Sequence, residues 1–391
     1  MKTVEEALKI VEENTLSNNN VIEIAVKNSF RYVLAEDVQS PIDMPPFPQS
    51  AMDGYAVNYD DQNLPIQLVG EVAAGQAQHY NLLSNQAVRI FTGAEVPPSA
   101  NMVIRQEDVK AKDHTLKVST FPRIGANIRP QGEQIRKGAV ALPHGHMLNE
   151  ASIGFLASLG ISSVGVYAMP KVAVISTGDE LVSIGETLNA GQIYDSNSLM
   201  LNAALCAKGF EESTIVKVKD NYQETVNAVE DALLKYDVLL CSGGISVGDY
   251  DFIGKALAEN KVVTKFYKVK QKPGKPLFFG KKENTYVFGL PGNPAACLTG
   301  FYIYALPLLN KLKGGSFSGL KLCKAKLKSD YTRKGDRAEF LKGEIVNNDA
   351  EILEGQSSAM LKSFSIANGL IYVPIEQTKI FAGDVISYYE L

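Results

Sequence analysis

The chain has 391 residues, of which 45% are hydrophobic and 21% charged, and its formal net charge is −4. This composition is typical of a globular protein with material for several cores, and at roughly 100–200 residues per domain the length predicts two to four domains. Its scattered lysines form no basic stripe, so we expect no nucleic-acid partner. No run reaches the ~18 apolar residues of a membrane span, and the acidic N-terminal segment has no signal-peptide core, so we expect no membrane partner.

The four cysteines contain no Cys-x-x-Cys pair, which argues against a disulfide framework or a structural zinc site. They are Cys206, Cys241, Cys297 and Cys323. We therefore expect reduced thiols and a cytoplasmic protein.

The first 168 residues combine two helical segments with a β-rich segment between them. Residues 3–13 and 149–160 have apolar residues at helical spacing, each after a residue typical of a helix N-cap. The intervening residues begin with a proline-rich connector and continue as short apolar runs separated by Gly and Pro turns, which predicts strands. We expect a discontinuous helical domain at 1–40 and 140–168, and an inserted β domain at 41–139.

Residues 169–314 alternate predicted strands with predicted helices. Strand runs such as Val172–Ile175 are apolar without alternation, which fits strands buried on both faces. This order predicts an α/β domain with a parallel, doubly wound sheet. Residues 315–391 return to short strands with Gly and Asn turns and predict a C-terminal β domain, so the fold class is α/β multidomain.

Ligands of open α/β sheets bind at the carboxyl ends of the strands, so the loops there are the first candidates for a site. The loop from Ser242 to Asp251 has three glycines and two serines ahead of a predicted helix, which favours an anion site. It lacks the Gly-Lys-Ser/Thr of a Walker A motif. A tight loop that serves only the backbone is the alternative.

Three neighbouring segments add charge or helix termini to this edge. The segment 176–180 combines small residues with acids, although an ordinary turn explains it equally well. Lys268, Lys272 and Lys275 lie in a Pro/Gly-stiffened loop suited to phosphate, or else form a solvated charge run. The segment 289–294 is expected to start a helix at Pro294 with Asn293 as its cap, which would leave free N–H groups.

A second candidate segment lies in the β domain. Asp53 stands in a Met-Asp-Gly turn, and Thr92 precedes a glycine; hairpin turns are the alternative for both. His144 and His146 are too few for a zinc site and are interpreted as surface residues. No Ser-His-Asp arrangement is evident, so acid–base chemistry would depend on carboxylates and lysines.

Six ordered motifs together resemble the MoeA-type molybdenum insertases, the molybdopterin molybdenumtransferases, which are similar to the E domain of gephyrin. The motifs are Pro46–Ala56, Thr92–Ala94, Ser176–Leu181, Gly243–Gly248, Lys272–Pro276 and Leu290–Pro294. The resemblance covers essentially the whole chain and implies the four domains given above, with an elongated helical domain and a molybdopterin-binding α/β domain. It also implies a homodimer whose active site joins the α/β domain of one subunit to the inserted domain of the other.

The reaction implied is the transfer of molybdate to adenylyl-molybdopterin with release of AMP, giving molybdenum cofactor, with Mg²⁺ required. Molybdopterin adenylyltransferase and molybdoenzyme-maturation proteins are the implied partners. The resemblance implies catalytic roles for Asp53, Thr92, Glu180, Asp220 and Asp251, with Glu180 and Asp251 as tentative Mg²⁺ ligands. It implies substrate binding by Thr177, Gly178, Asp179, Ser242, Gly243, Gly244, Ser246, Gly248, Lys268, Lys272, Lys275, Pro291, Gly292, Asn293, Pro294 and Arg337.

Gln134 departs from the family, which often has an acid at that position, so no metal-ligand role is assigned to Gln134 or Glu133. A non-catalytic molybdopterin-binding scaffold is the first alternative, against which stands the absence of a long disordered linker or an extra fused domain. A nucleotide hydrolase sharing only the α/β domain is the second, and the Ser50–Tyr55 segment argues against it. The sequence does not distinguish molybdate from tungstate.

Overall fold

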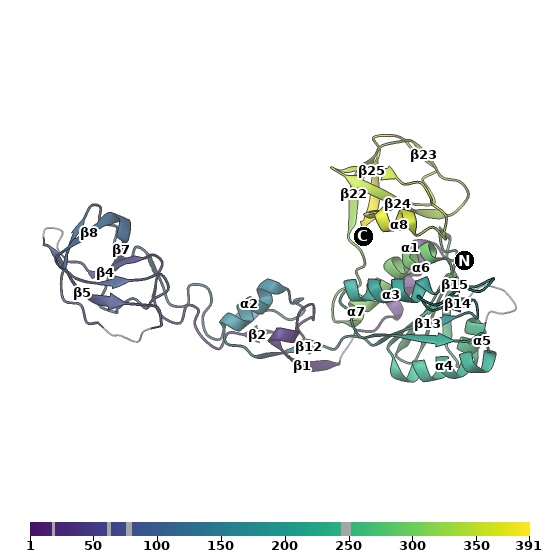
Figure 1. The fold of residues 1–391 in the computed structure, drawn as a ribbon, viewed down its shortest axis with the longest axis horizontal. Helices are drawn as coiled ribbons and strands as arrows, with labels where there is room; N and C mark the ends of the chain where they lie inside the picture. Colours follow the sequence, from purple (N-terminus) through teal and green to yellow (C-terminus); the bar gives the residue numbers. More distant parts are fainter. Residues whose placement is uncertain (18–19, 61–63, 76–79, 244–251) are drawn as a thin grey trace. The chain divides into compact units, whose positions relative to one another are not determined.

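The protein is described here by a computed structural model covering residues 1–17, 20–60, 64–75, 80–243 and 252–391. The chain divides into two compact units. Unit 1 contains Met1–Ile22, Arg31–Val33 and Val166–Leu391; unit 2 contains Glu23–Phe30 and Leu34–Gly165. Figure 1 labels the elements of both units. Within the described ranges, no helix is long and apolar enough to cross a membrane.

The centre of unit 1 is a six-stranded sheet. Its strands, in spatial order, are β16 (Ser213–Val218), β13 (Val172–Thr177), β17 (Val238–Ser242), β21 (Thr285–Leu290), β20 (Pro276–Lys282) and β18 (Val263–Lys268). The first four are parallel, but β20 and β18 are antiparallel to their neighbours. The expectation of a parallel sheet is therefore corrected at one edge. Only two residues, Glu283 and Asn284, join β20 to β21, and a parallel pair needs a much longer crossover.

Helices cover both faces of this sheet, as expected for a doubly wound domain (Figure 1). The helices α4 (Tyr222–Lys235) and α5 (Phe252–Glu259) share one apolar cluster with Ala173, Leu239 and Val287 of the sheet. On the opposite face lie α3 (Ser196–Ala207), α6 (Pro294–Gly300) and α7 (Leu306–Leu312), with a π turn at Phe301–Ala305 between the last two.

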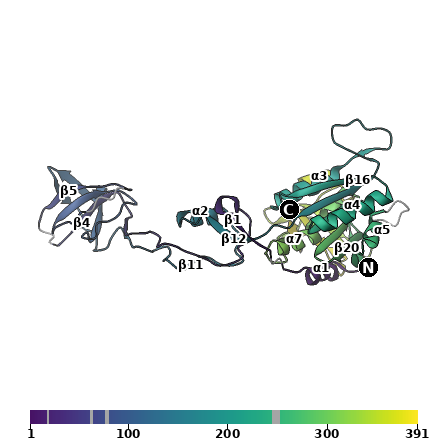
Figure 2. The ribbon, with the colours of Figure 1, turned by 90° about the horizontal axis from the view of Figure 1, so that it is seen from below.

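The N-terminal helix α1 (Val4–Asn14) belongs to the α/β core and not to a domain shared with residues 140–168. Its Val4, Ala7 and Val11 are buried in the cluster that contains the strand residues Val174 and Leu240. The sequence grouped α1 with residues 140–168, because helical periodicity shows that one face of the helix is buried but not which residues cover it. Figure 2 shows α1 against the α/β domain in a second view.

The C-terminal part of unit 1 is a closed five-stranded barrel, which confirms the expected β-rich character. Its strands are β22 (Leu322–Leu327), β24 (Ala338–Val346), β25 (Asp349–Ile352), β26 (Gly369–Val373) and β28 (Val385–Glu390), and β24 pairs with β26 to close the ring. The short strand β19 (Gln271–Lys272) of the α/β domain adds to β24. A hydrogen-bonded sheet thus continues from one domain into the other. Smaller elements of unit 1 are β14 (Leu181–Val182), β15 (Ile193–Tyr194), β23 (Tyr331–Thr332), β27 (Lys379–Ile380) and α8 (Lys362–Ile366).

Unit 2 contains the predicted β domain and the helix α2 (Glu150–Ser158), whose N-cap is Asn149 as expected. The main sheet has the order β7 (Met102–Arg105), β4 (Gly54–Asn58), β6 (Gln86–Ile90), β5 (Ile66–Val72), β9 (Thr115–Val118) and β8 (Val109–Lys112). Two-stranded pairings join β2 (Val38–Gln39) to β11 (Val140–Leu142), β3 (Gln49–Ser50) to β10 (Ile128–Arg129), and β1 (Val21–Ala25) to β12 (Ser163–Tyr167).

Candidate active site

Three predicted loops meet at the carboxyl edge of the central sheet. The register places Ser176, Ser242 and Leu290 side by side at the ends of β13, β17 and β21. A Cβ built on Gly243, whose φ is +87°, would lie 3.4 Å from the carbonyl oxygen of Thr177. A Cβ built on Gly292 would lie 3.7 Å from the Cα of Gly243. The backbones therefore approach closely, and a ligand at this edge would reach all three.

Asn197, at the start of α3, ties two of these loops together and was not expected from the sequence. Its Nδ2 donates to the Oγ of Ser242 and to the carbonyl oxygen of Gly292, both at 2.8 Å. The preceding Asp195 is buried, caps α3 through Ser198 N at 3.1 Å and accepts from Ser176 Oγ at 3.1 Å. Of these two residues only Asp195 has a local sequence signal, because Asp is a typical helix N-cap residue.

The predicted acids of this edge fall into two groups. Asp179 and Asp220 form two reciprocal hydrogen bonds that join the loops after β13 and β16. Asp179 N donates to the Asp220 carboxylate at 3.2 Å, and Asp220 N donates to the Asp179 carboxylate at 3.1 Å. Glu180 is exposed and folds back over Gly178, where an added Cβ would lie 2.6 Å from Glu180 Oε2. Glycine at 178 therefore leaves the space that the Glu180 carboxylate occupies.

Part of the predicted anion loop cannot be compared with the structure. Gly244, Ser246, Gly248 and Asp251 lie outside the described residues. Their proposed roles, including the tentative Mg²⁺ role of Asp251, remain predictions. Elsewhere in the chain, no three acidic, histidine or cysteine side chains converge into a metal-binding group among the described residues.

A cavity of about 390 Å³ lies beside these loops and is lined by basic and hydroxyl side chains. Its lining includes Lys272, Lys275, Pro291, Asn293, Arg337, Ser357 and Ser358. We call it the basic pocket. The Pro-Gly-Lys turn and the loops after β17 and β21 thus lie on the same side of the domain: a Cβ on Gly274 would be 3.5 Å from Pro291, which is next to Gly292.

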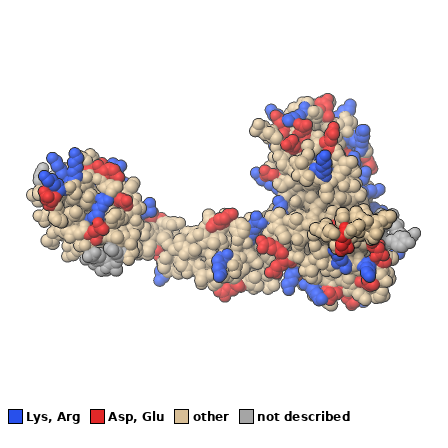
Figure 3. Space-filling model, in the orientation of Figure 1, with Lys and Arg blue, Asp and Glu red and all other residues tan. Residues whose placement is uncertain are grey.

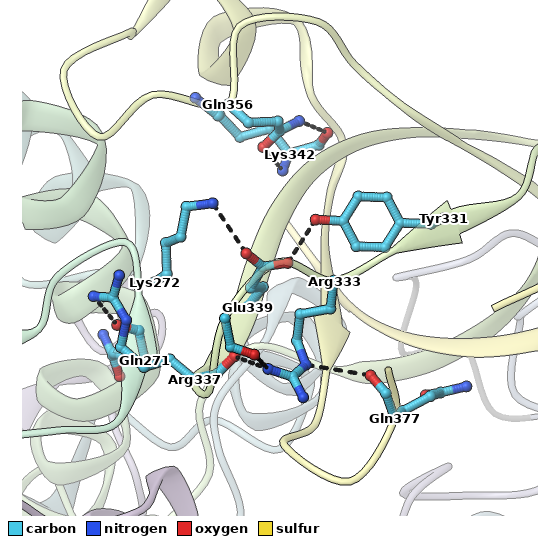
Figure 4. Close-up of polar contacts among 10 residues, drawn as sticks. Gln271, Lys272, Tyr331, Arg333, Arg337, Glu339, Lys342, Gln356 and Gln377 are labelled. Carbon is cyan, nitrogen blue, oxygen red and sulfur yellow. Dashed lines mark hydrogen bonds and ion pairs between the residues drawn. The ribbon is translucent and has the colours of Figure 1, made fainter. Parts of the chain in front are cut away.

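Lys272 is the lysine that the structure holds most firmly in the basic pocket (Figure 4). Its Nζ donates to the carboxylate of Glu339 at 3.0 Å; the Lys272 side chain is 46% exposed, whereas that of Glu339 is 1% exposed. Tyr331 Oη donates to the other oxygen of Glu339 at 2.5 Å, and burial together with this bond raises the pKa of Tyr331. The buried carboxylate therefore fixes the ammonium at the pocket wall and neutralises part of its charge.

The other predicted cations divide between the pocket and its surroundings. Arg337 lines the pocket, and its Nη1 donates to the carbonyl oxygen of Gln271 at 3.3 Å. Lys275 also lines the pocket. Lys268 is not among the lining residues; its Nζ lies 5.2 Å from the ring centroid of Tyr267. The structure therefore brings together Lys272, Lys275 and Arg337, but not Lys268.

The expected free N–H groups at the start of α6 are contradicted by the structure. Pro294 is the first helical residue as predicted, but the next two N–H groups, of Ala295 and Ala296, donate to the carbonyl oxygen of Ser358 at 2.9 and 3.2 Å. Asn293 makes no capping bond through its side chain and donates instead to Ser358 Oγ at 2.9 Å. The helix start is therefore occupied by the C-terminal domain, about 60 residues further along the chain.

In unit 2, the structure brings together Asp53, just before β4, and Thr92, just after β6. The Asp53 carboxylate accepts from Thr92 N and from Thr92 Oγ1, both at 2.8 Å. These bonds, with the backbone bond the larger, lower the pKa of Asp53 below its ordinary value of 3.8. The Met-Asp-Gly turn thus presents an ionised carboxylate at the protein surface. Lys, Arg, Asp and Glu are intermixed on the visible face of each unit in Figure 3, as the absence of a basic stripe predicted.

The cysteines and the His-Gly-His segment lie outside the basic pocket. All four cysteines are free; Cys241 and Cys297 are buried, and burial raises the pKa of both thiols to about 12. His146 contacts Ser152 Oγ at 2.8 Å in the capped start of α2.

The chain is similar to known proteins over nearly its whole length. Family models match the chain at residues 2–160 (MoeA N-terminal region, domains I and II), 173–311 (probable molybdopterin binding domain) and 324–391 (MoeA C-terminal region, domain IV). A molybdopterin molybdenumtransferase of Haemophilus influenzae is 38% identical over 370 residues, covering 91% of this chain and 90% of the relative. The chain belongs to the molybdopterin molybdenumtransferase family.

Further relatives of this family match over nearly their full length. A molybdopterin molybdenumtransferase of Nostoc is 34% identical and covers 90% of this chain and 84% of the relative. The solved structure of a molybdopterin biosynthesis MoeA protein from Pyrococcus horikoshii is 30% identical, with a TM-score of 0.81 over 99% of this chain and 98% of that one. The α/β multidomain class and the resemblance seen in the sequence are thereby confirmed.

Proposed function

We propose that this protein transfers molybdate to adenylyl-molybdopterin and releases AMP, giving molybdenum cofactor. The observation that supports it most directly is the convergence of Lys272, Lys275 and Arg337 with two serines in one pocket, beside the glycine loops at the carboxyl edge of the sheet. Membership of the molybdopterin molybdenumtransferases supplies the substrate class.

The basic pocket has the chemistry of an oxyanion site. Ammonium and guanidinium groups form charge-assisted hydrogen bonds to tetrahedral oxyanions, and hydroxyls add neutral donors. Lys272 is already oriented by Glu339, so an incoming anion would meet a positioned donor. In this proposal molybdate binds here, while Thr177, Gly243 and Gly292 leave room for the pterin phosphate against the backbone.

The carboxylates at this edge of the sheet are ligands of the kind that Mg²⁺ prefers. Mg²⁺ prefers hard oxygen ligands and is usually held by one or two carboxylates together with substrate phosphates. The Glu180 carboxylate makes no hydrogen bond or ion pair with another described side chain and lies in the space left by Gly178. We propose that Glu180 helps to hold the ion, with Asp251 as the second ligand predicted from the family. Bound there, Mg²⁺ would stabilise the charge on the phosphates as AMP leaves.

We further propose a cytoplasmic homodimer in which Asp53 and Thr92 complete the site of the partner subunit, as the family resemblance implies. Asp53 is ionised and exposed, which suits a carboxylate that acts on a ligand outside its own unit. Its hydrogen bonds from Thr92 would keep it charged throughout the physiological pH range. Molybdopterin adenylyltransferase would supply the substrate, and molybdoenzyme-maturation proteins would receive the product.

The test is molybdate-dependent AMP release by the purified protein, incubated with adenylyl-molybdopterin, Mg²⁺ and molybdate. The wild type should release AMP, and Asp53→Ala and Glu180→Ala should abolish release with unchanged circular dichroism. Full activity of both variants would refute these roles, and an inactive, folded wild type would refute the proposed reaction.

A further inference from the structure

Lys342 is a buried lysine that forms no ion pair with any described carboxylate. It lies on β24, on the strand face that carries Phe340, and is only 3% exposed. Burial lowers the pKa of its ammonium group. Because a buried ammonium is costly unless its N–H groups find acceptors, its contacts identify the segment that it stabilises.

Lys342 Nζ donates to acceptors within residues 355–360, which we call the serine loop; Figure 4 shows Lys342 beside Gln356 of this loop. Nζ donates to the carbonyl oxygens of Gly355 at 2.6 Å, Ser357 at 3.2 Å and Met360 at 3.1 Å. Three acceptors match the three N–H groups of an ammonium. One side chain therefore fixes most of the loop.

The backbone of Lys342 also forms hydrogen bonds with the serine loop. Lys342 N donates to Gln356 Oε1 at 3.0 Å, and Gln356 Nε2 donates to the carbonyl oxygen of Lys342 at 2.8 Å. Gln356 Nε2 also donates to the carbonyl oxygen of Leu353 at 2.7 Å. The loop is therefore anchored to β24 by both the main chain and the side chain of one residue.

The other side of the serine loop contacts the proposed site. Ser357 and Ser358 line the basic pocket. The carbonyl oxygen of Ser358 accepts the N–H groups of Ala295 and Ala296, and its Oγ accepts from Asn293. A shift of the loop would therefore move the two pocket hydroxyls and uncap the first turn of α6 together.

We propose that Lys342 is a positioning residue of the basic pocket, which holds the serine loop so that Ser357 and Ser358 face the oxyanion. This inference rests on the proposed function of the pocket. A neutral side chain at 342 would leave three carbonyl oxygens without their donor, and the loop would relax. An interaction that serves binding equally in the ground state and transition state raises KM when it is lost and leaves kcat nearly unchanged.

The experiment compares Lys342→Met with Lys313→Met in the full-length protein. Lys313 is a matched control: it is also buried, its pKa is also lowered by burial, and its Nζ lies over the Phe210 ring, 5.0 Å from the centroid. We expect Lys342→Met to raise the molybdate KM for AMP release roughly tenfold, the effect of misplacing one charge-assisted hydrogen bond. We expect kcat to change less than about twofold, and the control to keep its KM.

Amide hydrogen exchange gives a readout that does not depend on activity. Exchange at Ala295 and Ala296 should accelerate in Lys342→Met and stay unchanged in Lys313→Met, because only the first variant releases the Ser358 cap. If Lys342→Met does not fold, Lys342→Gln is measured in the same way and should show smaller changes of the same sign.

The outcomes separate this inference from the proposed reaction. Wild-type molybdate KM and wild-type exchange in a folded Lys342 variant would overturn the positioning role. A proportional fall of kcat in both the Lys342 and Lys313 variants, with unchanged KM, would also overturn it, because it would indicate a general loss of structure. An inactive wild type would instead refute the proposed reaction, while the exchange measurement would still test the loop contact.

Discussion

Lys272 in the basic pocket and Asp53 in unit 2 are both predicted site residues, but the structure holds them by opposite means. Lys272 is bonded to a buried carboxylate, Glu339, that lies on a barrel strand of another domain. Asp53 is fully exposed and is held by one residue, Thr92, through a backbone N–H and a hydroxyl. A change at Lys272 therefore disturbs a buried partner, whereas a change at Asp53 leaves only exposed groups behind.

The largest combined effect on activity and stability is expected for Lys272→Met. We expect AMP release to fall at least about 100-fold, by analogy with the loss of one positioned electrostatic contact to a reacting group. The free energy of unfolding should fall by about 1–3 kcal/mol, because Glu339 loses a partner while it stays buried. Enzyme assay and urea unfolding measure the two effects. Adding Glu339→Gln should restore stability but not activity, and a single variant as stable as the wild type would contradict the argument.

A smaller effect is expected for Asn197→Ala at the carboxyl edge. The variant removes both hydrogen bonds that Asn197 Nδ2 donates, to Ser242 and to Gly292. We therefore expect the free energy of unfolding to fall by about 1–2 kcal/mol and AMP release to fall roughly tenfold. Asn202→Ala is the control on the same helix, because the Asn202 side chain accepts a hydrogen bond from Ser213 Oγ and not from either loop. Equal loss of activity in both variants would show that Asn197 acts only through the stability of α3.

Thr92→Val tests how Asp53, the exposed residue of the comparison, is held. It removes the hydroxyl bond but keeps the backbone bond, so the pKa of Asp53 should rise toward 3.8 and remain below it. Because the folded pKa is depressed, the stabilisation from this contact is present above the unfolded pKa and is lost as pH falls through the folded value. NMR titration of the Asp53 carboxyl measures the shift. A pKa equal to that of the wild type would show that the hydroxyl contributes nothing.

The smallest effect concerns the thiols behind the carboxyl edge. Cys241 and Cys297, whose pKa burial raises to about 12, should resist iodoacetamide at pH 8, while Cys206 and Cys323 react slowly. Mass spectrometry of native and urea-unfolded protein counts the labelled cysteines. Rapid labelling of Cys241 in the native protein would mean that this edge opens readily.

Local signals account for the ends of several helices. Thr3, Asn149 and Asp195 cap the helices that follow them, and Gly160 and Gly209 lie just after helix ends with a positive φ. Each of these roles depends on a bond or a backbone conformation within a few residues. The edge hairpin of β20 and β21 was missed because its two-residue turn, Glu283-Asn284, lacks a glycine. Similarly, the sequence predicted the start of α6 at Pro294, but it did not reveal that the carbonyl oxygen of Ser358 accepts the first N–H groups of this helix.

The sequence by itself determined the alternation of strands and helices, the loops that meet at one sheet edge and the family, since these follow from periodicity, turn chemistry and short ordered motifs. Only the tertiary structure decided that Lys272 faces Glu339, that Lys342 holds the serine loop and that α1 packs in the α/β core. These contacts join residues 13 or more positions apart in the chain. Local patterns show that a side chain or a helix face is buried, but they do not show which distant residue it contacts.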